Sequence, residues 1–252
     1  MKVCVVVPSY NERENIAPLL DRISGVAISD LNVLFVDDSS PDGTADEVRK
    51  AMARSPRVHL LLRPEKLGIG SAHVEGFAWA LDKLGADIVS EMDSDLQHPP
   101  EKITQLVAAV EAGADIAVAS RKVEGGGVEG WSRWRRIVSS GANALTKVVL
   151  GLKVSDSTSG FRALSSRAVR VVIETSPVSK DYFFQVESLY SLKKKGMKIV
   201  EIPFTFRARE AGRSKMGVGE MFGFFLGVWR LKLSGVDESR KARQDTPRPS
   251  PM

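Results

Sequence analysis

The chain has 252 residues, 43% hydrophobic and 27% charged, which is enough apolar material for the core of one compact domain. Its single cysteine, Cys4, excludes an internal disulfide and suits a reducing compartment, and the three histidines show no zinc-type spacing. No apolar run reaches the roughly 20 residues of a membrane-spanning helix, and we find no signal-peptide pattern at the N-terminus.

The net charge of +5 is distributed unevenly along the chain. Residues 1–120 hold 11 Lys+Arg against 19 Asp+Glu (−8), whereas residues 121–252 hold 25 against 12 (+13). The basic half needs an anionic partner, and phosphates or a membrane surface are the obvious candidates. Nucleic acid is the rival partner, but we expect none, because the sequence has no helix-turn-helix, zinc-finger or RNA-binding aromatic signature.

Strands and helices are predicted to alternate through the first 120 residues. Apolar runs typical of buried strands occur at 3–7, 33–36, 58–62, 88–92 and 116–119. Amphipathic helical stretches lie between them, near 12–24, 43–53, 69–84 and 100–112. This order predicts an α/β fold in which helices cover both faces of a mostly parallel central sheet.

Longer helices are predicted beyond residue 120. A flexible glycine loop at 125–127 precedes a helix from about 135 to 151. The remaining elements expected are helices near 165–175, 182–195 and 216–233 and a strand at 199–203. Residues 236–252 carry charges, three prolines and no apolar period, so we expect a disordered tail there.

Turn-forming or polar residues follow three of the predicted strands, namely Pro8, residues 37–38 and residues 93–95. Open α/β sheets bind ligands at the carboxyl ends of their strands. Asp93 and Asp95 are two residues apart, so both can point to the same side, and Gln97 adds a neutral oxygen. Such oxygens suit Mg²⁺ or Mn²⁺. The alternative is a solvated turn that caps the following helix before the prolines at 99–100.

The ordered motifs resemble the inverting family-2 glycosyltransferases, whose α/β fold (GT-A, Rossmann-like) binds nucleotide sugars. They are VPSYNE at 7–12, VDDSSPDGT at 36–44 and DSDLQHP at 93–99. Within that group the chain is similar to the polyprenol-phosphate (dolichol-phosphate) mannose synthases. The residues that carry this similarity are SR at 120–121, the glycine loop before Trp131, residues 135–143, SGFR at 159–162 and REAGRSK at 209–215. The resemblance covers about residues 2–233 and leaves out the tail.

The resemblance implies a donor site in the acidic half. Pro8, Tyr10, Glu12 and Asp37 would contact the nucleoside, together with Asp93. Asp93, Asp95 and Gln97 match the metal site of the family position by position, and Asp95 would be catalytic through the metal. Residues 11–12 could instead cap the first helix, and residues 42–43 could form an ordinary turn. We interpret Asp38 as structural and His98 as a packed or solvated histidine.

The resemblance also implies an acceptor-phosphate site in the basic half, built from Arg121, Arg135 and Ser139. Arg135 and Ser139 are four residues apart on the predicted helix, so they share a face, and arginine can bind phosphate through two parallel hydrogen bonds. Arg209 and Lys215 would close over the diphosphate, although composition alone favours a surface loop there. We interpret Arg133 and Arg136 as solvated.

The implied activity is transfer of mannose from GDP-mannose to polyprenyl (dolichyl) phosphate, with inversion and with Mg²⁺ or Mn²⁺ as cofactor. UDP-glucose is the rival donor. A non-catalytic nucleotide-sugar or lipid-phosphate binding module and a basic membrane-surface adaptor are the alternatives from other classes. We expect a catalytic domain over 1–233, with a nucleotide-sugar and metal half at 1–120 and an acceptor and membrane-facing half at 121–233.

The segment from Met221 to Trp229 is apolar and aromatic but too short to span a bilayer, and Arg230 and Lys232 follow it. This pattern is typical of an interfacial helix, so we expect peripheral attachment at the cytoplasmic side of a membrane. Glycines at 219, 223 and 227 form a ridge suited to a small membrane-anchoring partner. The alternative is a helix packed on its own domain.

Overall fold

The structure is a computed structural model that describes residues 1–175, 179, 181–207 and 218–234, without the side chains of 218–222 and 234. The predicted tail at 236–252 therefore lies outside the described residues. Among the helices that are described, none is both long and apolar enough to cross a membrane.

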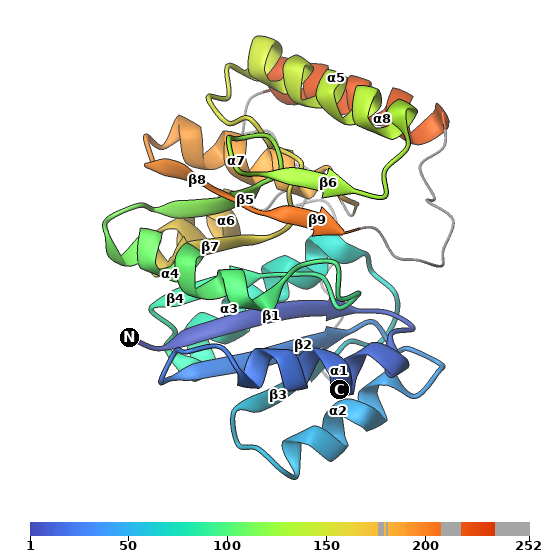
Figure 1. Cartoon of the computed structure of the whole chain (residues 1–252), viewed down its shortest axis with the longest axis vertical. Coiled ribbons are helices and arrows are strands. Elements are labelled where there is room, and N and C mark those ends of the chain that lie inside the picture. The colour runs from blue at the N-terminus through green and yellow to red at the C-terminus, as the bar shows by residue number, and fades with distance from the viewer. Residues whose placement is uncertain (176–178, 180, 208–217, 235–252) are drawn as a thin grey trace, which may run out of the picture.

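A seven-stranded sheet forms the centre of the molecule (Figure 1). Its strands, in spatial order, are β3 (Val58–Leu62), β2 (Leu31–Asp37), β1 (Val3–Ser9), β4 (Ile88–Glu91), β7 (Arg162–Ser165), β5 (Ile116–Ser120) and β8 (Ile199–Pro203). Only β7 runs antiparallel to its neighbours in this sheet. The prediction of a mostly parallel central sheet is confirmed, and one sheet takes strands from both the acidic and the basic half.

Alternate residues of each strand feed two hydrophobic layers, because successive side chains point to opposite faces. Val3, Val5 and Val7 of β1 pack with α1 (Arg13–Ser24), α2 (Thr44–Met52) and α4 (Ile103–Glu111). Cys4 and Val6 pack on the other face with α3 (Ile69–Leu84), α6 (Ser166–Thr175) and α7 (Phe184–Lys194). Helices therefore cover both faces, as predicted.

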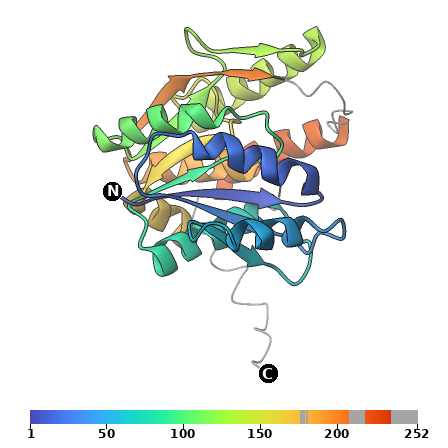
Figure 2. The same cartoon turned by 60° about the horizontal axis from the view of Figure 1, so that its bottom comes forward.

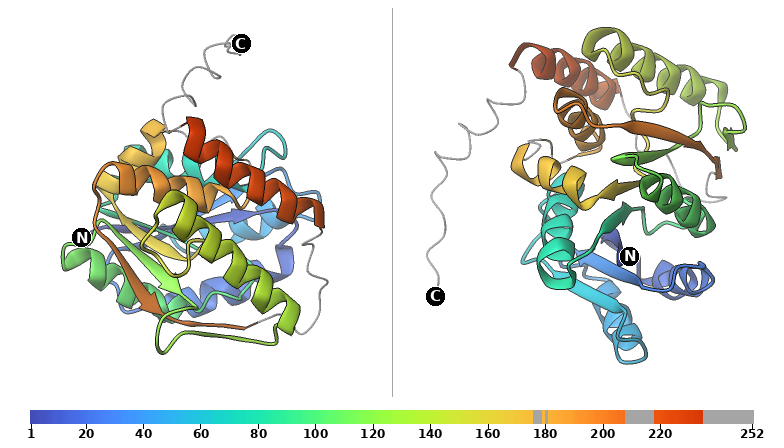
Figure 3. Two further views of the ribbon diagram at one scale, coloured as in Figure 1. Left: turned by 90° about the horizontal axis from the view of Figure 1, so that it is seen from above. Right: turned by 90° about the vertical axis from the view of Figure 1, so that its left-hand side faces the viewer.

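Two long helices, α5 (Arg133–Leu150) and α8 (Val218–Ser234), lie side by side beyond the β8 edge of the sheet (Figures 1 and 3). Leu150 of α5 and Val228 of α8 are buried in the hydrophobic layer that also contains α7. The short strands β6 (Gly127–Glu129) and β9 (Thr205–Arg207) pair in parallel and form a second, two-stranded sheet (Figure 2).

Three strands were not predicted, namely β6, β7 and β9, and each has only three or four residues. The flexible loop predicted at 125–127 is wrong in part, since Gly127 begins β6 and pairs with Thr205. Gly126 is needed for close approach, because a Cβ there would lie 2.5 Å from the carbonyl oxygen of Ser120. The helix predicted at 100–112 begins as a 3-10 turn, η1 (Pro100–Lys102).

Candidate active site

The carboxyl ends of β1, β2 and β4 meet at one edge of the sheet, since β1 pairs in parallel with both of the others. Apart from glycines, φ is positive at three residues of the described ranges, Asn11 (59°), Ser39 (53°) and Leu96 (64°). Each lies in the loop that follows one of these three strands. Unfavourable backbone conformations of this kind concentrate at functional sites, so this edge is the first candidate.

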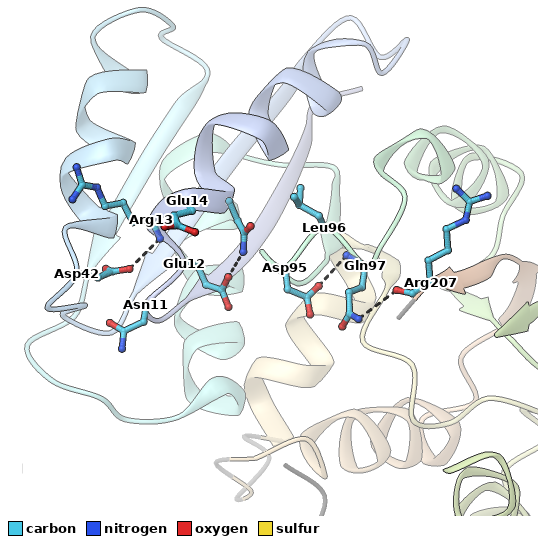
Figure 4. Close-up of a pocket in the computed structure, with 10 residues that line it drawn as sticks. Asn11, Glu12, Arg13, Glu14, Asp42, Asp95, Leu96, Gln97 and Arg207 are labelled. Atoms are coloured by element: carbon cyan, nitrogen blue, oxygen red, sulfur yellow. Dashed lines mark hydrogen bonds between the residues drawn. The ribbon is translucent and has the colours of Figure 1, made fainter. Parts of the chain in front are cut away.

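An open cavity of about 890 Å³ lies at this edge (Figure 4). Its lining residues come from the loop after β1 and the first turn of α1, from the loops after β2 and β4, and from the end of β9; they are Asn11, Glu12, Arg13, Glu14, Asn15, Asp42, Asp95, Leu96, Gln97 and Arg207. The close-up shows the side chains of Glu12, Asp95 and Gln97 side by side, whereas the guanidinium of Arg207 points away from them. Three residues predicted from the sequence are therefore brought together here.

Residues 93–98 form a hydrogen-bonded turn. The Asp95 carboxylate accepts from the backbone N–H of Gln97 (3.0 Å), and the Gln97 side chain donates to the carbonyl of Arg207 (3.3 Å). The turn proposed as an alternative to the metal site is thus present, and a binding turn can have both roles. Its capping role is wrong, because Pro99 occupies the N-cap position of η1 and no side chain caps it.

His98 is packed under this turn, as interpreted from the sequence. Its ring is buried, stacks on Phe161 with 5.0 Å between centroids, and accepts the backbone N–H of Asp93 through Nδ1 (3.0 Å). Burial, followed by the nearby charge of Arg121, lowers the pKa of His98 to about 3. The imidazole is therefore neutral, and its role is to orient the start of the Asp93–Gln97 turn.

The oxygen donors at this edge fit a hard divalent cation. Within the described ranges, no group of three or more His, Cys, Asp or Glu side chains is placed to hold a metal ion. Asp95 and Gln97 offer a carboxylate and an amide oxygen at the cavity. Asp93 is not among the residues that line it, and its Oδ2 lies 3.8 Å from Nε2 of the buried His98. Mg²⁺ commonly binds through one or two carboxylates and completes its shell with water and substrate phosphate, so this donor set suits a metal that arrives with a diphosphate.

The residues assigned to the nucleoside lie along β1 and β2. Tyr10 is 36% exposed, and the Lys66 ammonium lies 3.8 Å from its ring centroid. Asp37 is fully buried, and its carboxylate accepts from the backbone N–H (3.0 Å) and the hydroxyl (2.5 Å) of Ser40. Pro8 lies in β1 opposite Val36. The structure thus places Pro8 and Asp37 in adjacent strands and Tyr10 directly after β1, with Asp37 closing the loop after β2.

The loops of the donor side are also held by local hydrogen bonds. Glu12 occupies the N-cap position of α1, but its side chain bonds to the Asn15 side chain and caps no backbone N–H. Asp42 accepts from the backbone N–H of Thr44 (2.9 Å) and of Arg13 (3.1 Å), so the ordinary turn proposed at 42–43 is confirmed. Side-chain capping by Glu12 is wrong.

Asp38 forms a buried ion pair with Arg63, with 2.7 Å between Oδ1 and Nη1. Its other oxygen accepts the backbone N–H groups of Leu67 and Gly68, each at 3.2 Å. These bonds fix the segment before α3, which confirms the structural interpretation of Asp38.

The basic residues gather around one indole ring beside α5. The guanidinium carbon of Arg135 lies 4.2 Å from the Trp131 ring centroid, and that of Arg121 lies 5.2 Å from it. Ser139 follows Arg135 by one turn of α5. The structure therefore brings Arg121, Arg135 and Ser139 together, whereas Arg133 and Arg136 are exposed, as interpreted.

Three buried polar atoms at this indole have no hydrogen-bond partner among the described residues, namely Trp131 Nε1, Arg135 Nε and Ser139 Oγ. Buried polar groups are nearly always paired, so unpaired donors in one place indicate a missing acceptor. Burial, followed by the charge of Arg121, lowers the pKa of Arg135. An anion here would pair the donors and offset the crowding of positive charge.

The acidic and basic sites adjoin each other through Phe206. Its ring lies 6.0 Å from that of His98 under the Asp93–Gln97 turn, and 5.6 Å from that of Trp131. The Asp93–Gln97 turn and the Arg121–Arg135 cluster therefore pack close to the same aromatic side chain.

Residues 4–173, more than half of the chain, match the sequence profile of glycosyl transferase family 2. The chain belongs to this family.

Three curated relatives extend this similarity over most of the family-2 chain. An undecaprenyl-phosphate mannosyltransferase of Micrococcus luteus is 38% identical over 96% of this chain and 99% of its own length. A polyprenol monophosphomannose synthase of Mycolicibacterium smegmatis is 41% identical over 85% and 81%. A dolichol-phosphate mannosyltransferase of Pyrococcus furiosus is 38% identical over 92% of this chain and 64% of its own. The resemblance noted in the sequence is confirmed.

Solved structures show the same fold at lower sequence identity. Glucosyl-3-phosphoglycerate synthase from Mycobacterium tuberculosis, in complex with Mn²⁺, UDP and phosphoglyceric acid, has a TM-score of 0.69 and 20% identity, covering 92% of this chain and 78% of that one. Its complex with Mn²⁺, UDP-glucose and phosphoglyceric acid gives 0.69 and 21%, covering 92% and 80%. The predicted GT-A fold is confirmed.

A buried charged cluster below the end of β4 was not predicted from the sequence of this family-2 chain. Glu91 lies one strand position before Met92, is buried, and pairs with the buried Arg162 at 3.5 Å. Burial raises the pKa of Glu91 to about 7, and Arg162 opposes that change. His73 lies 3.4 Å from the other Glu91 oxygen. The signal available was a charged residue inside an otherwise apolar strand.

Arg209 and Lys215 lie outside the described residues. The last described residue before them is Arg207, which lines the cavity and whose side chain pairs with Glu129 at 3.1 Å.

Proposed function

We propose that this family-2 chain transfers mannose from GDP-mannose to the phosphate of a polyprenol, with inversion, giving GDP and a β-mannosyl-phospho-polyprenol. The observation that carries the proposal is the cluster of unpaired buried donors on Trp131, Arg135 and Ser139, beside the acidic cavity. The names of three relatives support mannose as the sugar and a polyprenyl phosphate as the acceptor.

In the proposed reaction an oxygen of the acceptor phosphate attacks C1 of the sugar from the face opposite the diphosphate. The bond from C1 to the diphosphate oxygen breaks, and its electron pair leaves with GDP. The second pKa of a phosphate monoester is about 6, so the acceptor is already largely anionic at neutral pH and needs no general base. Arg121, Arg135 and Ser139 would bind and orient this anion.

On the donor side, Pro8, Tyr10, Glu12 and Asp37 would contact the nucleoside. Asp93, Asp95 and Gln97 would hold Mg²⁺ or Mn²⁺, which when bound neutralises charge on the diphosphate. Arg209 and Lys215 would add positive charge to the same group. Asp95 would be catalytic because it binds the metal ion that neutralises the diphosphate.

We further propose that the chain docks peripherally on the cytoplasmic side of a membrane, through an apolar surface on α5 and α8. This α5–α8 surface consists of Trp134, Ile137, Phe225, Trp229 and Leu233, all at least 43% exposed. The exposed cations Arg136, Arg230 and Lys232 are on the same two helices. Apolar side chains bordered by cations suit an interfacial helix at anionic lipids.

The packed-helix alternative holds for one side of α8. Phe224 packs on Phe183 with 5.4 Å between ring centroids, and a Cβ at Gly227 would lie 3.1 Å from the same ring. Gly227 therefore serves its own domain. A Cβ at Gly223 would meet nothing within 4 Å, so Gly223 leaves room for the proposed small membrane-anchoring partner.

The experiment compares labelled GDP-mannose with labelled UDP-glucose, each with polyprenyl phosphate and Mg²⁺. We expect sugar to enter the lipid only from GDP-mannose, with inhibition by GDP and a β-anomeric product by NMR. Faster transfer from UDP-glucose would overturn the donor assignment. Tight binding of either nucleotide sugar without any transfer would indicate a binding module.

A further inference from the structure

Arg121 is held by a buried carboxylate that the sequence motifs did not single out. Asp156 is fully buried, and its Oδ2 accepts from the Nε (2.6 Å) and the backbone N–H (3.0 Å) of Arg121. Its Oδ1 accepts from Nη2 of Arg121 at 2.6 Å. The two groups form a bidentate fork, the geometry in which an arginine is most firmly oriented.

The carboxylate of Asp156 is itself fixed in place. Glu201 of β8 accepts the backbone N–H groups of Ser155 (2.8 Å) and Asp156 (3.1 Å). The hydroxyl of Thr158 donates to Oδ1 of Asp156 (3.2 Å) and accepts from Nη2 of Arg121 (3.0 Å). The orientation of Arg121 is therefore set by β8 and by the loop before β7, not by α5.

Asp156 also changes the charge that an acceptor would meet. Burial raises the pKa of Asp156, but the hydrogen bonds and charge of Arg121 outweigh this effect and hold it below its usual value. The carboxylate is ionised and compensates Arg121. Arg135 has no ion-pair partner at 4.0 Å or less among the described residues, so it supplies the uncompensated charge at Trp131.

We propose that Asp156 is a positioning residue of the acceptor site, which orients Arg121 and leaves Arg135 as the main charge that attracts the acceptor phosphate. This inference rests on the proposed function, because it assigns that phosphate to the Arg121–Arg135 site. Asp156 acts through Arg121 and touches no substrate. Loss of Asp156 should therefore slow transfer to the acceptor phosphate and leave binding of the sugar nucleotide unchanged.

A double-mutant cycle tests this dependence. Asp156→Asn and Arg121→Gln are each expected to lower kcat with polyprenyl phosphate by about 10- to 100-fold, because a misplaced group costs rate more than binding. The KM for GDP-mannose should change by less than about twofold in both. The double variant should be no slower than Arg121→Gln alone, since Asp156 has no function without its partner. A double variant whose loss of kcat equals the product of the two single losses would overturn the proposal.

A control exists at the other end of β5, the strand that Arg121 follows. Asp115, just before β5, forms a similar fork, in which its Oδ1 accepts from Nε of Arg167 (3.0 Å) and its Oδ2 accepts from Nη2 (2.9 Å). Asp115→Asn removes the same charge from an Arg–Asp pair far from Trp131 and should leave kcat unchanged. If Asp156→Asn does not fold, Thr158→Val weakens the same fork and should lower kcat by about 3- to 10-fold. An unchanged kcat in folded Thr158→Val would contradict the proposal.

Binding of inorganic phosphate separates this inference from the proposed function. The NMR signal of the Arg121 Nε–H, identified by its loss in Arg121→Gln, should be protected from exchange in the parent and shift on addition of phosphate. In Asp156→Asn that protection should vanish. A parent that moves no mannose but shows both effects would overturn the proposed function alone. The positioning role would be overturned if the Arg121 Nε–H of the parent exchanged rapidly with solvent, or if its signal did not shift on addition of phosphate.

Discussion

The guanidinium carbon of Arg135 lies 4.2 Å from the centroid of the Trp131 ring, in a site where Nε of the arginine and Nε1 of the indole are both buried and unpaired. Stacking on the ring holds the cation at the first turn of α5, while its donors are left for a ligand. A phosphate would pair with Arg135 most strongly, since charge-assisted hydrogen bonds are about twice as strong as neutral ones.

Arg135→Ala should raise the KM for polyprenyl phosphate by about 10-fold or more and leave the KM for GDP-mannose nearly unchanged, because one charged hydrogen bond is worth roughly 1.5–3 kcal/mol. Steady-state kinetics with each substrate varied in turn provides the measurement. Arg133→Ala is the control, since Arg133 is an exposed cation on the same helix. Lost nucleotide affinity with normal acceptor affinity would contradict the assignment.

Asp95→Asn should lower kcat by about 100-fold or more with the fold intact, because the amide keeps the shape of the side chain but removes the charge that holds the metal and diphosphate. Rates in Mg²⁺ and in chelator, together with circular dichroism, check this. Glu14→Gln removes a charge from the same cavity wall outside the predicted metal set and should retain most of the activity. An Asp95→Asn enzyme with near-normal rates would refute the metal assignment.

Membrane docking should depend on Phe225 and Trp229, whose exposed rings lie 6.4 Å apart on α8. The pair Phe225→Glu with Trp229→Glu should reduce binding to anionic liposomes, and high salt should weaken binding of the parent. Phe224 is less suitable for this test, because it packs on Phe183.

The charge-matched control for that experiment is Met52→Glu with Leu62→Glu, two exposed apolar residues near β3 at the far end of the sheet. Liposome co-sedimentation at low salt should not distinguish this control from the parent. If the α8 variant sediments as well as the control, docking through the α5–α8 surface is wrong.

Cys4 should be inert in the folded protein. Burial raises the pKa of its thiol to about 12, so at pH 8 almost none is thiolate, and the side chain has no exposed surface. Labelling by a thiol reagent should be about 100-fold or more slower than in concentrated guanidinium chloride, because the reaction requires unfolding. Ser24→Cys in a Cys4→Ala background is an exposed control and should react at once. Prompt labelling of native Cys4 would place it outside the core.

Elements with a clear hydrophobic period could be predicted from the sequence. The helix expected at 69–84 coincides with α3, because its apolar face is continuous and Gly85 in a left-handed conformation (φ 62°) ends it. β7 could not be predicted, since it has four residues, begins with the charged Arg162 and pairs with β4 and β5 from distant parts of the chain. Strands this short carry too little period to be recognised.

The site residues also divide into those with a recognisable sequence pattern and those without one. Asp95 and Arg135 lie in recognisable motifs, so the sequence placed them at a strand end and on a helix. Asp156 and Glu91 are buried charges whose partners, Arg121 and Arg162, are 35 and 71 residues away. A buried carboxylate is stable only when such a partner is present, and that pairing exists only in the folded chain.

The proposed reaction requires that the acceptor carry a phosphate, and this requirement can be tested directly. Labelled GDP-mannose and Mg²⁺ are incubated with polyprenyl phosphate, with the same polyprenol lacking its phosphate, or with neither, and label in the lipid phase is measured alongside released GDP. We predict lipid label only with polyprenyl phosphate, in amounts equal to the GDP released. Transfer to the unphosphorylated polyprenol at a similar rate, or GDP release without lipid label, would contradict the acceptor site at Arg135 and Trp131.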